Sequence, residues 1–82
     1  MNWVYILECN DKTLYTGWTN NLDKRIQVHN EGLASKYTSA RLPVNLVYFE
    51  EFDEKKQAQK REYQIKQYSR KEKLRLIQSK SC

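Results

Sequence analysis

Arg25 and His29 are four residues apart, so a helix over this stretch would place both side chains on one face. An arginine guanidinium can direct two N–H groups at the oxygens of a phosphate. An imidazole can hydrogen-bond a phosphate or assist proton transfer. The alternatives are a solvated helix residue for Arg25 and a structural histidine at a helix end for His29. As the only histidine, His29 cannot belong to a site of several histidines.

Glu62 is the candidate metal ligand. A single carboxylate, with water and a phosphate oxygen completing the coordination shell, suits Mg²⁺. The alternative is an ordinary helical ion pair, because Lys66 follows Glu62 at i+4. The spacing alone does not separate the two interpretations.

Tyr5 and Tyr15 are ten residues apart, each within a stretch that favours a β-strand. A phenol near a metal ion and an arginine can hold an attacking water or take a proton from it. An unperturbed tyrosine titrates near 10, so the site would have to stabilise the phenolate. The alternative is a pair of core aromatic residues whose hydroxyl groups are hydrogen-bonded within the protein.

Gly17 and a polar segment are candidates for contact with a ligand. Gly17 near a strand end allows close backbone approach, where a side chain would block substrate, or it marks a bulge. Lys36, Tyr37 and Thr38 are candidate phosphate or base contacts in a polar loop over residues 32–42. A solvated loop is the alternative for these three residues.

The elements expected to position these side chains begin with two strands, over residues 2–8 and 13–18, joined by turn residues 10–12. Asn20 is the expected N-cap of the following helix, and Gly32 is its expected end.

Pro43 is expected to open a third strand over residues 44–52, in which Val44, Leu46, Tyr48 and Glu50 share one face. Asp53 would cap a helix that runs to about residue 68.

A last helix should begin at Ser69, which forms a capping-box pattern with Glu72. Leu74 and Ile77 would form its apolar stripe, with Leu76 beside it. The predicted fold class is α+β, with the order ββαβαα and a small three-stranded antiparallel sheet flanked by helices.

The chain has 82 residues, which indicates a single domain over residues 1–82. Residues 1–50 carry no net charge, whereas residues 51–82 hold ten of the 15 Lys and Arg and five of the 10 Asp and Glu. A basic surface of this kind attracts polyanions. The two cysteines, Cys9 and Cys82, match no zinc or disulfide pattern, and no apolar run approaches a membrane span. We therefore expect a cytoplasmic protein without a membrane association.

Five landmarks occur in order along the chain: Val4-Tyr5-Ile6, Tyr15-Thr16-Gly17, Arg25, His29-Asn30 and Glu62. This series resembles the GIY-YIG endonuclease superfamily, in particular its small stand-alone bacterial members, over residues 3 to about 68. The C-terminal helix, over about residues 70–79, follows this core. Four departures are visible: the first motif matches cleanly only at Tyr5, and the second has Thr16 in place of isoleucine. Trp18 stands where some relatives have lysine, and no asparagine follows the glutamate.

The resemblance implies a metal-dependent endonuclease that hydrolyses phosphodiester bonds in structured or single-stranded nucleic acid, with a link to DNA repair. It implies that Tyr5, Tyr15, Arg25 and His29 are catalytic, that Glu62 binds one Mg²⁺ or Mn²⁺ ion, and that contacts to nucleic acid come from Gly17, Lys36, Tyr37, Thr38 and Lys66. DNA is favoured over RNA, and a protein partner could supply specificity.

Two alternatives stay open at the level of sequence. One is a nucleic-acid-binding module on the same fold with little or no cutting, which the departures from the motifs favour. The other is a small scaffold that docks on a protein through its basic face. Whether the chain is an enzyme is therefore undecided by sequence.

Overall fold

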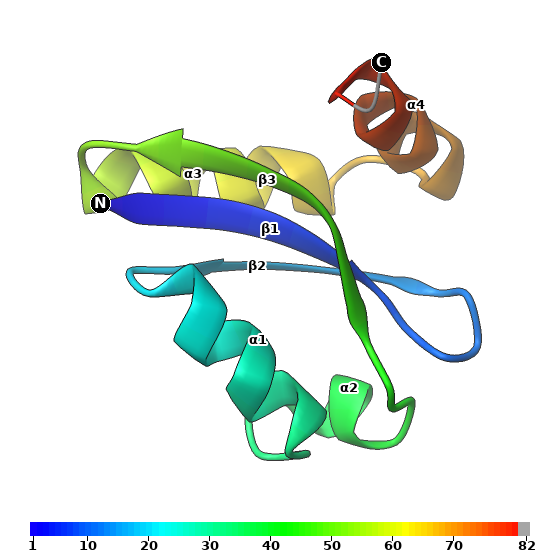
Figure 1. Cartoon of the computed structure of the whole chain (residues 1–82). Helices are drawn as coiled ribbons and strands as arrows, with labels where there is room; N and C mark the ends of the chain where they lie inside the picture. Colours follow the sequence, from blue (N-terminus) through cyan, green and yellow to red (C-terminus); the bar gives the residue numbers. More distant parts are fainter. Residues whose placement is uncertain (81–82) are drawn as a thin grey trace.

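The computed structural model describes residues 1–80 and contains a three-stranded antiparallel sheet of order β2-β1-β3 (Figure 1). The elements in chain order are β1 (Asn2–Glu8), β2 (Leu14–Thr19), α1 (Leu22–Asn30), α2 (Lys36–Ser39), β3 (Asn45–Phe52), α3 (Lys55–Lys66) and α4 (Arg70–Lys80). The predicted α+β class and the order ββαβαα are confirmed, with the short helix α2 as an addition.

The central strand β1 is buried on both faces of the sheet. Successive side chains of a strand point to opposite faces, so Val4 and Ile6 pack with α3 while Tyr5 and Leu7 pack on the side of α1. Helices α1 and α3 therefore cover opposite faces of the sheet, and β2 forms one of its edges (Figure 1).

Strand β3 does not keep a single alternating pattern. The pairing shifts between Ile6, which faces Tyr48, and Leu7, which faces Leu46, so that Val47 is an extra residue. A bulge of this kind reverses the faces of the residues beyond it. Leu46 therefore packs on the side of α1 and Tyr48 on the side of α3, and the prediction that they share one face is wrong.

The ends of α1 and α3 differ by one or two residues from those predicted. Asn21, not Asn20, is the N-cap of α1, and its side chain accepts a hydrogen bond from the backbone N–H of Lys24. Glu54, not Asp53, is the N-cap of α3 and forms a capping box with Gln57.

Residues 32–42 are not a loop throughout, because α2 lies within them. The Ser35 hydroxyl oxygen accepts a hydrogen bond from the Tyr37 N–H and caps the helix. Only four residues are helical, which is too short for an apolar period to reveal. This turn of helix directs Thr38 into the interior, where its side chain is fully buried.

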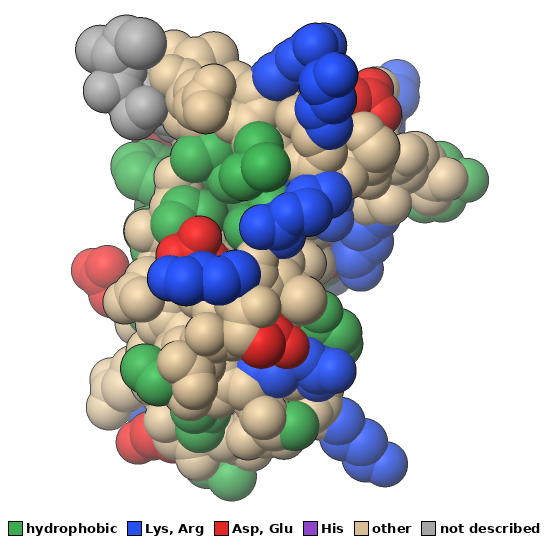
Figure 2. All heavy atoms as spheres, turned by 90° about the vertical axis from the view of Figure 1, so that its right-hand side faces the viewer, with side chains coloured by type: hydrophobic (Ala, Val, Ile, Leu, Met, Phe, Trp, Pro, Cys, Tyr) green, Lys and Arg blue, Asp and Glu red, His purple; other side chains and the backbone are tan. Residues whose placement is uncertain are grey.

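Helix α4 begins with the predicted Ser69–Glu72 capping box, and both of its hydrogen bonds are present. Leu76 and Ile77 pack on the core, whereas Leu74 is exposed, so the predicted stripe is shifted. Figure 2 shows hydrophobic side chains at the surface below α4, next to Lys and Arg side chains.

No helix within residues 1–80 is long and apolar enough to cross a lipid bilayer. Cys9 is a buried free thiol, and Cys82 lies outside the described residues.

Candidate active site

The candidate site is centred on a buried chain of hydrogen bonds on the α1 side of the sheet. The Tyr5 hydroxyl lies 2.8 Å from His29 Nε2, and His29 Nδ1 lies 2.9 Å from the Thr38 hydroxyl. All three side chains are at most 1% exposed. A β-strand, a helix and the short helix α2 thus meet at one imidazole.

The direction of these hydrogen bonds follows from the last partner. The Thr38 hydroxyl donates to the Ser35 carbonyl oxygen at 3.3 Å, so its oxygen accepts from His29 Nδ1–H. The other ring nitrogen, Nε2, is then unprotonated and accepts from the Tyr5 hydroxyl. His29 is therefore placed as the acceptor for the proton of Tyr5.

The imidazole of His29 is neutral at pH 7. Burial, followed by the positive charge of Arg25, lowers its pKa from 6.5 to about 4. Burial also raises the pKa of Tyr5, against the lowering effect of Arg25. Without a ligand the shared proton therefore stays on the phenol.

Folding stability is expected to fall as the pH is lowered from 6.5 to 5, because only the unfolded chain protonates His29 readily in this range. The pKa of His29 is lower in the folded state than in the unfolded chain. The neutral imidazole therefore makes its full contribution to folding stability above pH 6.5, and this contribution declines as the pH falls toward 4. The expected loss is roughly 2 kcal/mol by pH 5, measured by urea unfolding. A His29→Gln variant should lack most of this slope, and an equal slope in both proteins would contradict the assignment.

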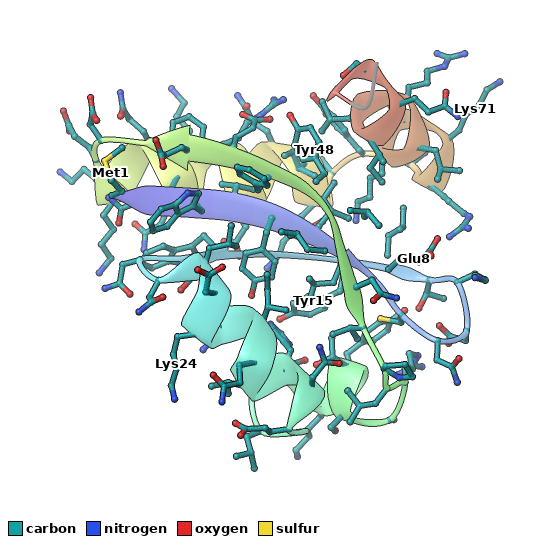
Figure 3. All side chains as sticks on the ribbon, in the orientation of Figure 1. Met1, Glu8, Tyr15, Lys24, Tyr48 and Lys71 are labelled. Atoms are coloured by element: carbon teal, nitrogen blue, oxygen red, sulfur yellow. The ribbon has the colours of Figure 1, made fainter. Side chains whose placement is uncertain are left out.

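Tyr15 extends the site toward the surface. Its ring meets His29 edge-on at a centroid distance of 5.3 Å and stacks on Tyr37 at 6.0 Å. The guanidinium of Arg41 covers the Tyr37 ring at 3.9 Å. In Figure 3 the labelled Tyr15 lies between the sheet and the α1–α2 side of the molecule. Tyr37 is 38% exposed and can still meet a ligand.

Gly17 provides the space that the Tyr5 ring occupies. The two residues face each other across β1 and β2, and a Cβ on Gly17 would lie 2.5 Å from the Tyr5 hydroxyl oxygen. The sequence suggested that substrate would approach this backbone. The structure shows that the Tyr5 phenol itself lies over Gly17, so the glycine positions the phenol at the edge strand.

Arg25 lies beside the phenol and the imidazole, since its charge lowers the pKa of both Tyr5 and His29. Its Nε atom is buried and has no hydrogen-bond partner within the described residues. A buried N–H of a charged group without an acceptor is unfavourable. An acceptor for this one N–H would remove that cost.

Glu62 lies on α3, which covers the face of the sheet opposite to α1. Its carboxylate pairs with Lys66 at 3.3 Å, and its side chain is 19% exposed. Glu62 is also linked electrostatically to Tyr5, because its charge raises the pKa of the phenol.

Metal-ligating residues are sparse in the described part of the chain. Within residues 1–80, no group of three or more His, Cys, Asp or Glu is placed to hold a metal ion. A single carboxylate such as that of Glu62 suits an ion whose other ligands are water and substrate oxygens.

The structure places the predicted residues in different surroundings. Contacts or electrostatic effects join Tyr5, Tyr15, Arg25, His29 and Glu62. Thr38 and His29 are fully buried, so they position Tyr5 and are not open to the direct ligand contacts that the sequence suggested. Lys36 and Lys66 are both exposed, and Lys66 also forms the ion pair with Glu62.

Sequence reasoning missed Arg41 as the cover of Tyr37 and missed Thr16, whose hydroxyl is buried without a partner in the described structure. The threonine in place of isoleucine at position 16 was the visible sign of an unusual residue there.

The fold and this cluster define the class of the protein. The family model of the GIY-YIG catalytic domain matches residues 1–75, and the chain belongs to the GIY-YIG family. Membership gives it a nuclease-type fold and implies interaction with nucleic acid in general.

Within that class the chain is similar to the UPF0213 proteins. It is 63% identical to the UPF0213 protein CPE1444 of Clostridium perfringens over 81 residues, which cover 99% of this chain and 87% of the relative. It is 60% identical over 77 residues to the UPF0213 protein of Syntrophus aciditrophicus, covering 93% of this chain and 88% of the relative.

The solution NMR structure of the UPF0213 protein BH0048 from Bacillus halodurans has the same fold. The TM-score is 0.64 at 44% sequence identity, and the match covers 98% of this chain and 86% of that chain.

Proposed function

We propose that the protein is a metal-dependent endonuclease that hydrolyses phosphodiester bonds in structured or single-stranded nucleic acid, with DNA as the favoured substrate. The observation that carries this proposal is the buried, unpartnered Nε of Arg25 beside the Tyr5–His29 pair. A phosphate oxygen would supply the missing acceptor, and the phenol would then lie close to the phosphorus.

Each residue would have a separate task. Arg25 would bind the phosphate and offset the charge that grows on its oxygens. Tyr5 or the half-buried Tyr15 would act on the attacking water, and if Tyr5 takes the proton of the water, its own proton passes to Nε2 of His29. Thr38 holds the imidazole in the tautomer that can accept.

Glu62 would hold one Mg²⁺ or Mn²⁺ ion, and such an ion, when bound, stabilises charge on the phosphoryl and leaving oxygens. Glu62 would first have to give up its ion pair with Lys66, which is partly exposed and therefore weak. Lys66 is then free to contact the backbone of the nucleic acid. Lys36 and Tyr37 would make further contacts at the surface of α2.

The test is incubation of the purified protein with flapped, branched and single-stranded DNA and RNA in Mg²⁺, Mn²⁺ or EDTA. We expect metal-dependent cutting by the wild type and its loss in Glu62→Ala. The matched control is Glu51→Ala, which removes an exposed carboxylate of β3 and should cut normally. Equal cutting by wild type and Glu62→Ala would overturn the proposal.

A second candidate function is a nucleic-acid-binding module with little or no cutting. The ion pair that already occupies Glu62 favours it. Binding without products under all metal conditions, unchanged in Glu62→Ala, would select this function.

A further inference from the structure

A pocket lies between the β1–β2 turn and α4, away from the Tyr5–His29 pair. It has a volume of about 220 Å³ and is lined by Thr13, Leu14, Tyr68, Arg70 and Lys73. We call it the hairpin–α4 pocket. Leu14 packs on the α3 side of the sheet, whereas Tyr15, the next residue along the edge strand, packs on the α1 side. The pocket and the candidate active site are thus on opposite faces of one edge strand.

The two cations that line this pocket, Arg70 and Lys73, are not paired with a carboxylate in the described part of the chain. Arg70 donates a 2.7 Å hydrogen bond to the Lys12 carbonyl oxygen, which holds the guanidinium beside the turn without neutralising it. Burial and the nearby charge of Lys66 lower the pKa of Lys73, as expected for a cation in a partly desolvated, positively charged place.

A line of charges joins this pocket to the candidate active site. The charge of Lys66 acts on Lys73, Lys66 pairs with Glu62, and the charge of Glu62 acts on Tyr5. These side chains come from α4, α3 and β1.

We propose that the hairpin–α4 pocket binds a backbone phosphate of the nucleic acid at a position away from the bond to be cut. Arg70 and Lys73 contact the phosphate oxygens. Leu14 and Tyr68 supply an apolar wall for the sugar or base attached to that phosphate. Figure 2 shows such a juxtaposition, with hydrophobic side chains exposed below α4 and Lys or Arg side chains next to them. This inference rests on the proposed interaction with nucleic acid, but not on cleavage.

The experiment measures binding of fluorescein-labelled flapped and single-stranded DNA by anisotropy in EDTA, over a series of salt concentrations. We expect Lys73→Gln to weaken binding about fivefold or more and to lower the salt slope by about one. The matched control is Lys71→Gln, which removes the same charge from the same helix. Lys71 is exposed and does not line the pocket, so its variant should bind within about twofold of wild type.

Chemical shifts distinguish a bound phosphate from a general effect of charge. We expect the amides of Leu14 and Lys73 to shift with DNA in the wild type, and not in Lys73→Gln. Arg70→Gln should weaken binding as well, with circular dichroism showing that α4 remains folded. Equal weakening by Lys73→Gln and Lys71→Gln, or no binding by the wild type, would overturn the inference.

Two further measurements test whether the pocket prefers nucleic acid over other anions, and whether DNA binding in the pocket is independent of the proposed cleavage. Inorganic phosphate or a polyglutamate peptide that shifts the same amides as strongly as DNA would overturn the commitment to nucleic acid. If the wild type binds DNA through Lys73 but cuts nothing, the proposed hydrolysis fails and this inference stands.

Discussion

Replacing Arg25 with methionine is expected to lower the cleavage rate by about 10³-fold while leaving the fold as stable as before, or more stable. The loss follows from removing the donors that would offset charge on the phosphoryl oxygens. The stability follows from the Nε atom, which is buried without a partner in the described structure. Methionine keeps much of the side-chain volume and removes a desolvated charge.

The matched control is Lys24→Met, the adjacent cation on α1, which is exposed and points into solvent (Figure 3). It should change neither the single-turnover cleavage rate nor the melting temperature appreciably. Opposite signs for activity and stability are the mark of a residue selected for function. A melting temperature of Arg25→Met well below that of Lys24→Met, with cleavage intact, would show that Arg25 is structural.

Much of the fold could be predicted because strong local patterns agree with the tertiary arrangement. The run from Asn2 to Glu8 is apolar at both parities, as a central strand requires, and β1 is indeed buried on both faces. Ser69 and Glu72 form the capping box that their spacing predicts. The bulge at Val47 could not be foreseen, because the pairing with β1, not the composition of β3, decides where the alternation breaks.

The candidate site was predictable by residue type but not by arrangement. Tyr5 and His29 are 24 residues apart, and only the packing of α1 on the sheet brings them to 2.8 Å. Thr38 looked like a surface residue because a four-residue helix leaves no periodic pattern. The sequence also could not show that Glu62 approaches from the other face, since helix periodicity gives the buried side of α3 but not the face of the sheet it covers.

Replacing Gly17 with alanine is expected to destabilise the protein by roughly 2 kcal/mol and to remove most of the cleavage activity. The added methyl carbon would lie 2.5 Å from the Tyr5 hydroxyl oxygen and 2.7 Å from its Cζ. The ring has no free space into which to retreat, because Tyr5 is 1% exposed and its hydroxyl is bound to His29. Any shift that relieves the clash moves the phenol away from the imidazole, so stability and activity should fall together.

Urea unfolding and single-turnover cleavage measure the two effects, and Gly32→Ala is the control. Gly32 has a φ of +78° and no atom closer than 3.8 Å to an added Cβ, so its variant should lose roughly 1 kcal/mol through backbone strain and keep its activity. In a Tyr5→Leu background the ring is gone, and Gly17→Ala should then cost much less than it does alone. An equal cost in both backgrounds would mean that the glycine is needed for its backbone and not for the phenol that lies over it.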